Sequence, residues 1–430
     1  MLLPRLPSDP IELSIIGGRY PNLQGRPFIK FIQLKSLNII SDNLEIVKNS
    51  AFEGLKNLKQ LKIKALLKSF EENSFKPCPL LEIVDFSSNK ITALNSVAVA
   101  AKPLMHLSKL IFSDNPNLES LAADDLIALE NSPVNYLDFT KCNLKNLGKG
   151  AFSHLKNLTH LILSENRLLA SDISNALDKI SPSLTVLWLK RINMTNVSNA
   201  FLWLSNTNLE EFILEGNNLQ FIKNESFPLM FNLKKLDVSD NHLEGIETSV
   251  FIKWPNLEKL YLTSNRLTQI PLNVSLRMNK LVHLDLSHNY IQLVKRRAFF
   301  TSVPNLSYLD LSNNNITHNL LLYETGLREL ETLQISYNFV APWHRSVVHD
   351  KKMALKKLYI GNNKLNIVTS EMLADFRRLK YVYLDGNPLD CSKCEMSAFV
   401  KWINRSVHVY HSKCRAEGMH LGLTNCSIEI

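Results

Sequence analysis

Apolar and polar positions follow one short pattern along most of this chain, Leu-x-x-Leu-x-Leu-x-x-Asn-x-Leu, which recurs fifteen times between Leu34 and Leu389. Within each copy, the alternation of apolar and polar residues predicts a short strand with one inward and one outward side. The ninth position, here called the asparagine position, recurs every 23 to 27 residues, at Asp42, Leu66, Asn89, Asn115, Cys142, Asn166, Ile192, Asn217, Asn241, Asn265, Asn289, Asn314, Asn338, Asn363 and Asn387. A repeat of this length predicts a solenoid in which each copy adds one strand and one return segment.

The repeat Leu281-Val-His-Leu284-Asp-Leu286 illustrates the pattern. Side chains alternate along a strand, so Leu284 and Leu286 are predicted to face inward. His283 and Asp285 are then predicted to face outward. One repeat cannot bury its leucines alone, whereas stacking on both neighbours buries them, which is worth roughly 1.5–3 kcal/mol per leucine. An inward asparagine can donate and accept at once, so it is predicted to satisfy backbone groups where the chain leaves the strand.

The return segments carry a second pattern, a phenylalanine at a matching offset. It occurs in Ala51-Phe52, Ser74-Phe75, Ala151-Phe152, Ser226-Phe227, Val250-Phe251 and Ala298-Phe299, and we expect these rings to stack beneath the convex side. Together the two patterns resemble the typical extracellular leucine-rich repeats of animals, found in Toll-like receptors and in insect adhesion proteins such as chaoptin and connectin. The resemblance covers about residues 31–430. It implies an α/β solenoid, a leucine-rich-repeat horseshoe with a parallel sheet on its concave face.

Four repeats depart from asparagine at the asparagine position. Cys142 is an accepted substitute in such repeats, and Asp42 can still accept hydrogen bonds. The side chains of Leu66 and Ile192 cannot make hydrogen bonds, so the turns of these two repeats are predicted to be less well stabilised. The spacing is longest before Asn115, Cys142 and Ile192, which predicts extra residues in those return segments and a more regular C-terminal half.

The unbroken repeat predicts one elongated domain in three parts. Residues 1–30 are expected to be a lead-in without a recognisable cysteine cap, residues 31–389 about fifteen leucine-rich repeats, and residues 390–430 a cysteine-containing C-terminal cap. Phe399 and Trp402 are expected to form the apolar plug of that cap.

The cap contains four of the six cysteines. In the family that the chain resembles, the first cysteine bonds the third and the second bonds the fourth, which implies a disulfide-bonded cap with Cys391–Cys414 and Cys394–Cys426. Two residues separate the first two cysteines here, where the family usually has one. A zinc site is the alternative, but eleven residues separate the second pair, unlike paired Cys-x-x-Cys motifs.

The two remaining cysteines, Cys78 and Cys142, fall on different levels of the predicted stack. Two strand spacings separate them by roughly 10 Å, whereas a disulfide needs Cα atoms within about 7 Å. We therefore predict that they are not bonded to each other, with Cys142 a buried thiol and Cys78 in a loop.

Nine Asn-x-Ser/Thr sequons favour an oxidising, secretory environment, although each sequon alone is a weak signal. They are Asn157, Asn193, Asn196, Asn224, Asn273, Asn305, Asn315, Asn404 and Asn425. The first residues lack the apolar run of a signal peptide, and the sequence has no apolar stretch of 18 residues. We interpret the chain as a fragment or an incomplete gene model, of extracellular or cell-surface origin.

Composition and motifs argue against several classes of function. The net charge is +9, but basic residues are interspersed with acidic ones, so the charge pattern argues against a nucleic-acid partner. The sequence lacks His-Glu-x-x-His, Gly-x-Ser-x-Gly and glycine-rich phosphate loops. Its histidines, including His160 and His283 on predicted strands, are predicted to be outward surface residues. We therefore predict no enzyme activity and no cofactor.

Function is expected on the outward side of the strands, where positions from successive repeats form columns. In the middle repeats Tyr136, Ile162, Trp188 and Ile213, with Ile111, predict an exposed apolar patch of the kind that marks a partner site. The alternative is that loops cover it. A second cluster, Tyr261, Tyr308, Tyr337, Tyr359, Tyr381 and Tyr383, is interleaved with Lys235, Lys259 and Lys357. Such tyrosines resemble protein-binding hot spots, although a ladder that only stabilises neighbouring strands is the alternative.

Three functional hypotheses follow. The first is an extracellular recognition module of a receptor or adhesion protein, including Toll-like innate immune receptors, that binds a protein or microbial ligand on its concave or lateral surface and can form a homodimer. The second is a secreted matrix or scaffold protein. The third is a cytoplasmic protein-binding scaffold, in which the cap cysteines would be free thiols.

Overall fold

The computed structural model describes residues 10–197, 201–271, 278–292, 302–317, 327–346, 354–403 and 409–410. The chain divides into two compact units. Unit 1 comprises residues 1–218 and 225–233, and unit 2 comprises residues 219–224 and 234–430. In each unit, successive repeats stack through a parallel sheet, as the period of the sequence predicts.

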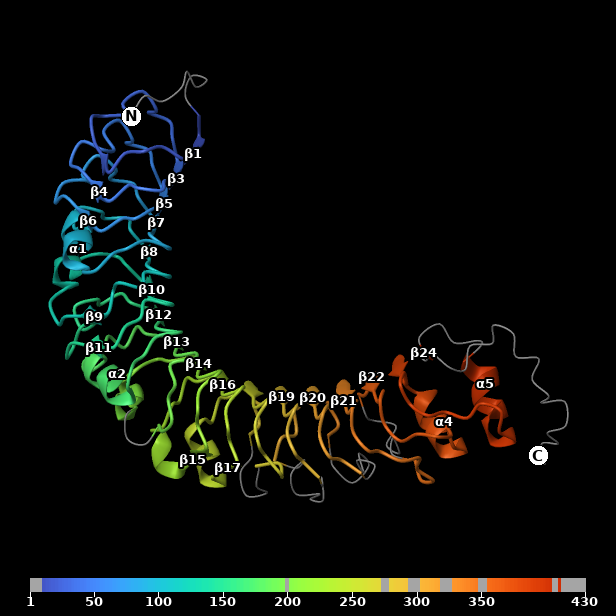
Figure 1. Cartoon of the computed structure of the whole chain (residues 1–430). Coiled ribbons are helices and arrows are strands. Elements are labelled where there is room, and N and C mark those ends of the chain that lie inside the picture. Colours follow the sequence, from blue (N-terminus) through green and yellow to red (C-terminus); the bar gives the residue numbers. More distant parts are fainter. Residues whose placement is uncertain are drawn as a thin grey trace. The chain divides into compact units, whose positions relative to one another are not determined.

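The sheet of unit 1 adds one strand per repeat in chain order. Its strands are β1 (Glu12–Ile16), β3 (Ser36–Ile40), β5 (Gln60–Lys64), β7 (Ile83–Asp85), β8 (Lys109–Ile111), β10 (Tyr136–Asp138), β12 (His160–Ile162), β13 (Val186–Trp188) and β14 (Glu211–Ile213). Each strand pairs in parallel with the next. The strands of unit 1 line one side of the stack, and α1 and α2 lie on the other (Figure 1).

The sheet of unit 2 is built in the same way. Its strands are β16 (Lys235–Asp237), β18 (Lys259–Tyr261), β19 (His283–Asp285), β20 (Tyr308–Asp310), β21 (Thr332–Gln334), β22 (Lys357–Tyr359), β23 (Tyr381–Tyr383) and β24 (Val409–Tyr410). Each of these pairs in parallel with the next, so equivalent residues of successive repeats form columns across the sheet.

The return segments hold short helices and two-residue strands. The helices are α1 (Asn95–Ala101), η1 (Ile127–Leu129), α2 (Ala170–Ala176), η2 (Leu202–Asn206), η3 (Asn224–Ser226), η4 (Thr248–Lys253), α4 (Ser370–Phe376), η6 (Cys394–Met396) and α5 (Ser397–Ile403). The strands β2 (Asn22–Leu23), β4 (Ile46–Val47) and β6 (Ser69–Phe70) pair with one another, as do β9 (Ser120–Leu121) with β11 (Asn146–Leu147) and β15 (Phe221–Ile222) with β17 (Gly245–Ile246). The return segments of the three longest repeats contain α1, η1 and α2.

Inward leucines and stacked phenylalanines form the core. Leu284 and Leu286 are buried, which confirms the predicted phase of that strand. In the return segments the rings of Phe52 and Phe75 stack with centroids 5.8 Å apart, which confirms the expected column at this point. The structure adds Phe28, whose ring stacks on Phe52 at 6.3 Å. Phe299 lies outside the described residues.

Buried asparagines connect the turns, as expected. The Asn265 amide oxygen accepts from the Leu243 backbone N–H at 3.0 Å, and its amide nitrogen donates to the carbonyls of Val238 and Leu262. Cys142 replaces asparagine with a buried thiol that donates to the Phe112 carbonyl at 3.1 Å. The Ile192 side chain is buried at the same position but has no polar group to offer.

The residue before each of these buried positions has a left-handed backbone conformation. This holds for Ser88, Asp114, Lys141, Glu165, Arg191 and Gly216 in unit 1, and for Asp240, Ser264, His288, Asn313, Tyr337, Asn362 and Gly386 in unit 2. The left-handed residue turns the chain away from the strand and lets the next side chain enter the core.

The first two repeats turn differently, and the expected asparagine positions Asp42 and Leu66 are wrong. Both residues are exposed, and 36% of the surface of Leu66 is accessible to solvent. Ser41 and Ala65, each 8% exposed, take the buried position instead. The reason is local: β3 and β5 stay extended for five residues, and the described turns after them contain no left-handed residue. The inward position therefore arrives one residue early.

Residues 10–30, expected as a lead-in, form a further turn of the solenoid. The backbone N–H of Gly17 donates to the Ile40 carbonyl at 2.8 Å, and β1 pairs with β3 along its whole length. Two glycines with positive φ, Gly17 and Gly18, occupy the turn where later repeats have a left-handed residue before asparagine. The repeat motif does not match here because the asparagine is absent.

The C-terminal elements of unit 2 contain the expected cap residues. Phe399 is fully buried in α5, its ring 6.0 Å from that of Trp402. Trp402 in turn stacks on Phe376 of α4 at 6.4 Å. Cys391 is buried and Cys394 begins η6, while Cys414 and Cys426 lie outside the described residues, so the disulfide pairing of the cap stays a prediction. Cys78 and Cys142 are free and buried, which confirms that they are not bonded to each other.

Candidate functional site

The outward side chains of β8 to β14 form a surface that we call the unit-1 face. Tyr136 lies on β10 of this face. Its ring lies 5.4 Å below the Lys109 ammonium and 5.7 Å from the ring of His160. Burial raises the pKa of Tyr136, and the nearby Asp138 carboxylate adds to the shift. Burial and the charge of Lys109 lower the pKa of His160. His160 is thus a half-buried residue that packs against Tyr136 on this face.

Trp188 dominates the rest of the unit-1 face. Its indole N–H donates to the Glu211 carboxylate at 2.8 Å, and the Lys190 ammonium lies 5.3 Å from the ring centre. Ile162 and Ile213 pair with Trp188 on either side, yet they are only 4% and 1% exposed. The prediction that these two isoleucines are exposed is wrong, because short side chains beside a large fixed ring lose their contact with water. Tyr136 and Trp188 remain half-buried.

The outward side chains of β16 to β23, here the unit-2 face, hold stacked aromatic rings. The His283 imidazole lies parallel to the Tyr308 ring, with centroids 4.2 Å apart, and 4.8 Å from the Tyr261 ring. Burial lowers the pKa of His283, and Lys259 acts in the same direction, so the neutral imidazole is favoured between the two rings. The Tyr308 hydroxyl donates to Asp310 at 3.2 Å, and burial together with that carboxylate raises the tyrosine's pKa.

A second aromatic stack lies on β22 and β23. The rings of Tyr359 and Tyr383 are 4.1 Å apart and nearly parallel, at 8°. Beside them, the Lys357 and Lys380 ammonium groups lie 5.7 and 5.3 Å from the Tyr381 ring centre. The structure therefore brings together Tyr359, Tyr381 and Tyr383, as the sequence predicts.

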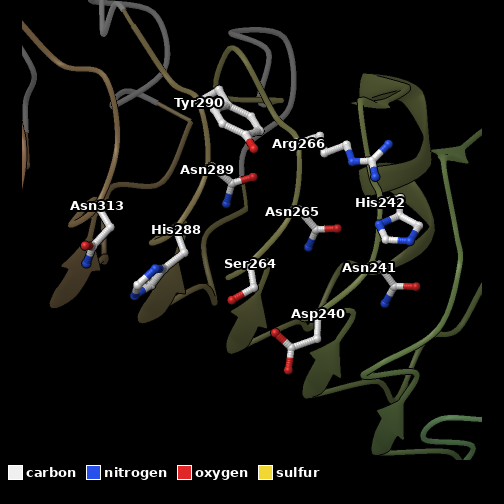
Figure 2. Close-up of a pocket in the computed structure, with 10 residues that line it drawn as sticks. All are labelled: Asp240, Asn241, His242, Ser264, Asn265, Arg266, His288, Asn289, Tyr290 and Asn313. Atoms are coloured by element: carbon white, nitrogen blue, oxygen red, sulfur yellow. The ribbon is translucent and has the colours of Figure 1, made fainter.

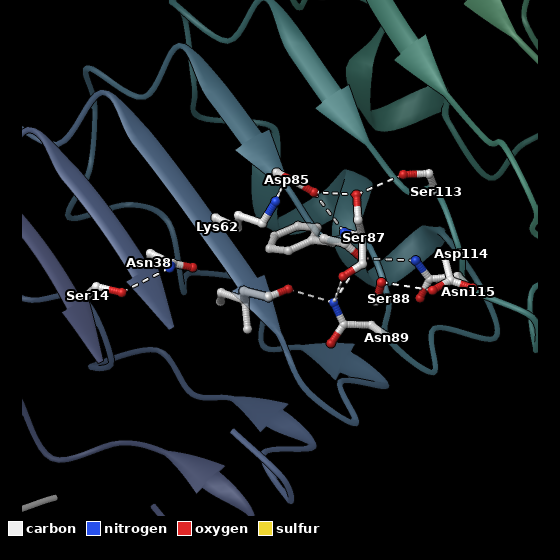
Figure 3. Close-up of polar contacts among 12 residues, drawn as sticks. Ser14, Asn38, Lys62, Asp85, Ser87, Ser88, Asn89, Ser113, Asp114 and Asn115 are labelled. Carbon is white, nitrogen blue, oxygen red and sulfur yellow. Dashed lines mark hydrogen bonds and ion pairs between the residues drawn. The ribbon is translucent and has the colours of Figure 1, made fainter. Parts of the chain in front are cut away.

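The strand aspartates have a structural role that explains their frequency. Asp85 accepts from the Ser87 backbone N–H at 2.9 Å and from the Ser87 hydroxyl, and that hydroxyl lies 2.8 Å from the Ser113 hydroxyl (Figure 3). Asp285 accepts both bonds from Ser287 in the same way. An Asp-x-Ser pair thus closes the end of a strand, so an aspartate in this column does not by itself indicate a ligand.

A groove runs along one edge of the unit-2 sheet, across successive repeats (Figure 2). Its volume is about 560 Å³. The buried asparagines of the turns lie in the middle row, between two more exposed rows: Asp240, Ser264, His288 and Asn313 on one side, and His242, Arg266 and Tyr290 on the other. We call this the edge groove.

Models of leucine-rich repeats match most of the chain. The BspA type leucine rich repeat region matches residues 26–117 and 107–185, and two further leucine rich repeat models match residues 207–267 and 231–291 and residues 305–323. Together these matches span more than half of the sequence. The chain is a leucine-rich-repeat protein. This family of repeat proteins is non-enzymatic, which confirms the prediction that the protein is not an enzyme.

Two curated proteins resemble parts of this leucine-rich-repeat protein. Over 175 residues it is 28% identical to Toll-like receptor 3 of Bos taurus, covering 39% of the chain and 19% of that receptor. Over 160 residues it is 29% identical to Tsukushi of Gallus gallus, covering 36% of the chain and 34% of that protein. The similarity thus spans about a fifth and a third of these relatives' length.

Solved structures show the same fold over nearly the whole chain. A chain of the Drosophila Toll–Spatzle complex agrees with a TM-score of 0.73 at 19% identity, covering 94% of this leucine-rich-repeat protein and 61% of that chain. A Leptospira interrogans leucine-rich-repeat protein agrees with a TM-score of 0.63 at 21% identity, covering 93% and 89%. A chain of the mouse RP105/MD-1 complex agrees at 0.59 and 16% identity, covering 94% and 80%.

Sequence reasoning missed the residues of the edge groove and misplaced one tyrosine. Tyr337 is an exposed left-handed turn residue and does not lie on the unit-2 face with the other tyrosines. His242, Arg266 and Tyr290 each follow a buried asparagine, so they recur with the period of the leucine-rich repeat. Reading the columns on both sides of the asparagine position would have found them.

Six sequons lie at exposed positions of the leucine-rich-repeat protein: Asn157, Asn193, Asn196, Asn224, Asn305 and Asn315. Asn273, Asn404 and Asn425 fall outside the described residues. Within the described parts, no helix has the length and apolar character needed to cross a membrane, and no group of three His, Cys, Asp or Glu side chains is arranged to hold a metal.

Proposed function

We propose that this leucine-rich-repeat protein is the extracellular ligand-recognition module of a receptor or cell-adhesion protein, of the Toll-like innate immune kind. The observation that carries the proposal is the unit-2 face, where stacked aromatic rings on neighbouring strands present a broad, half-exposed surface. Tyrosine provides large contact area and a hydrogen-bonding hydroxyl at low entropic cost, which makes it frequent in protein-binding hot spots.

The geometry of the rings favours contact with a protein. In the Tyr359–Tyr383 stack, each ring fixes its neighbour, so little side-chain freedom remains to be lost on binding. Stacked pairs of this kind contribute about 0.5–1.5 kcal/mol beyond area burial. The same contacts stabilise the sheet, and the proposal assigns them a second role as a preorganised contact surface.

Known complexes support a protein partner. The Toll–Spatzle and RP105/MD-1 structures, which share this fold, are complexes between different proteins. For the present chain we propose that the concave unit-2 face, with Tyr261, Tyr308, Tyr359, Tyr381 and Tyr383, is the main contact. Tyr136 and Trp188 of the unit-1 face are the second, smaller one.

We further propose that the protein is an N-glycosylated, disulfide-capped ectodomain. The six described sequons are exposed to solvent, as attached glycans require. The proposed cap pairs Cys391 with Cys414 and Cys394 with Cys426, and encloses the end of the core beside Phe399 and Trp402. Such disulfides form in the oxidising environment of the secretory pathway.

Binding to a panel of purified extracellular proteins, measured by surface plasmon resonance, tests the contact surface. The expected result is a partner whose affinity falls about tenfold or more in a Tyr359→Ala/Tyr383→Ala double variant, because hot-spot truncations cost about 2 kcal/mol or more. Tyr337→Ala is the control for loss of a surface tyrosine, since Tyr337 is 57% exposed but lies off the face. A partner that binds wild type and the double variant equally well would refute the role of the unit-2 face.

Alkylation of the unreduced protein, secreted from insect cells, tests the extracellular assignment. We expect Cys391, Cys394, Cys414 and Cys426 to resist alkylation, and peptide mass spectrometry to find glycans on the exposed sequons. Four reactive cap thiols would instead favour the cytoplasmic scaffold. Cys78 and Cys142 provide an internal control, because they are free yet buried and react only after unfolding.

A further inference from the structure

The edge groove has a rigid backbone. On one side Asp240, Ser264 and His288 hold positive φ angles of 51°, 53° and 52°. Their backbone N–H groups donate to the next repeat, as the Ser264 N–H does to the Ser287 carbonyl at 3.0 Å. On the other side, the Arg266 N–H donates to the Leu243 carbonyl of the preceding repeat at 2.9 Å. Both sides are therefore fixed to their neighbours at every level.

The middle row of the groove offers little to a ligand. The Asn265 and Asn289 amides are buried and already bonded to backbone groups of their own and the preceding repeat. Recognition must therefore come from the two outer rows.

The outer rows carry polar groups that the described fold leaves unused. Among the described contacts, no hydrogen bond or ion pair involves the side chain of His242, Arg266 or His288. In unit 1 the cations that precede the buried position are paired, Lys141 with Glu165 at 3.4 Å and Arg191 with Glu215 at 3.3 Å. His288 has the equivalent position in unit 2 and no such pair among the described contacts. Arg266 is exposed, so its guanidinium faces solvent on a fixed backbone.

The charge and shape of these rows favour a carboxylate ligand. Arginine presents a planar set of donors that matches a carboxylate in a bidentate pair. One repeat further, Tyr290 is 55% exposed and offers an aromatic surface. The groove also contains Asp240 and only one permanent cation, Arg266, which disfavours a polyanion such as a nucleic acid, whose binding depends on many cationic contacts.

We propose that the edge groove binds a short acidic segment of a protein, with Arg266 holding a carboxylate, His242 and His288 donating hydrogen bonds beside it, and Tyr290 packing against an adjacent apolar side chain. This proposal rests on the proposed function in one respect, namely that the acidic segment belongs to the protein partner. The unit-2 face contacts the body of the partner, and the groove contacts an extended part of it.

Fluorescence anisotropy with the purified full chain tests this proposal. The probe is a fluorescein-labelled peptide, Gly-Asp-Glu-Leu-Asp-Phe-Gly-Gly, and its control replaces the acidic residues with the matching amides. We expect the acidic peptide to bind and the amide peptide to bind at least about fivefold more weakly. Arg266→Glu should weaken the acidic peptide by at least about fivefold, and Tyr290→Ser by about threefold.

Lys280→Glu is the matched control for charge reversal. Lys280 is exposed and precedes β19, so it lies at the other end of the strand from the groove. We expect this variant to bind the acidic peptide like wild type. Circular dichroism checks that each variant is folded, and Arg266→Gln replaces Arg266→Glu if the latter is not.

Several results would overturn the proposal. These are no binding of the acidic peptide at about 1 mM, equal loss in Lys280→Glu and Arg266→Glu, or equal binding of the amide peptide. Tighter, Arg266-dependent binding of a 12-nucleotide oligothymidylate would assign the groove to nucleic acid instead. The Tyr359→Ala/Tyr383→Ala variant should keep its peptide affinity, so failure of the unit-2 face and failure of the groove are separate results.

Discussion

Asp85 in unit 1 and Asp285 in unit 2 occupy the same position of the repeat and differ in their electrostatics. Both carboxylates accept two hydrogen bonds from the serine two residues later. Burial acts to raise the pKa of Asp85, but the ion pair with Lys62 at 2.7 Å and the bonds from Ser87 outweigh it and leave the pKa lowered. For Asp285 burial prevails, with Asp310 and Asp237 nearby, and the pKa is raised.

The difference shows that the repeat sets the geometry of an aspartate and the adjacent strand sets its charge state. In unit 1 the preceding strand supplies Lys62 (Figure 3), whereas around Asp285 the neighbouring aspartates add negative charge. The unit-2 face therefore carries carboxylates that a positively charged partner surface would stabilise. The edge groove beside it has the opposite preference.

Truncation of the asparagines behind the two aspartates should give the largest effect and should be the same in both units. Asn89 bonds to the backbone of Ala65 and Ile63, and Asn289 to that of Leu267 and Leu262. Replacing either with alanine leaves buried backbone groups unpaired, so we expect a loss of about 2–4 kcal/mol in each case. Urea unfolding with amide exchange measures it. A loss confined to one variant would mean that the units also differ in their cores.

Removing the charges should have smaller effects of opposite sign. A lowered folded pKa means that Asp85 stabilises the fold above its unfolded pKa, and that this stability is lost as pH falls through the folded pKa. Asp85→Asn should therefore destabilise the protein at pH 7, and the loss should shrink as pH falls through the folded pKa. A raised folded pKa means that ionised Asp285 is unfavourable, so Asp285→Asn should stabilise it at pH 7, with the gain vanishing as pH falls through the folded pKa. Thermal unfolding from pH 3 to 7 distinguishes the two signs.

The smallest effect on stability should come from replacing Lys62, the cation that lowers the pKa of Asp85 relative to that of Asp285. Lys62→Ala removes the partner of Asp85, but Lys62 is half-exposed, so we expect a change of no more than about 1 kcal/mol. The variant should also raise the pKa of Asp85, visible as a shift of the acid unfolding limb. Lys59→Ala is the control, because its ion pair with Glu82 is exposed on both sides. Equal shifts in the two variants would indicate a general charge effect.

Much of the fold could be predicted from the sequence, because the inward positions repeat with a constant period. Leu284, Phe52 and Cys142 all lie where the pattern places them. The pattern failed at Asp42 and Leu66, because a left-handed residue is a backbone property that the spacing of leucines does not reveal.

The candidate sites were less predictable, since they depend on side chains from several repeats. The columns of outward residues were foreseen, but the burial of Ile162 and Ile213 depends on the size and anchoring of Trp188 between them. The edge groove could not be read from one repeat at all. His242, Arg266 and Tyr290 become neighbours only when three turns are stacked.

The left-handed turn residues have a consequence for how this molecule could be altered. Glycine adopts that backbone freely, whereas residues such as Lys141, Arg191 and Tyr337 hold it at about 1–3 kcal/mol each. Gly216 and Gly386 show that the turn accepts glycine. Each turn with a non-glycine residue therefore carries a small backbone strain and exposes one side chain. Substitution to glycine would relieve that strain, and another side chain could be introduced, in one repeat at a time without changing the core.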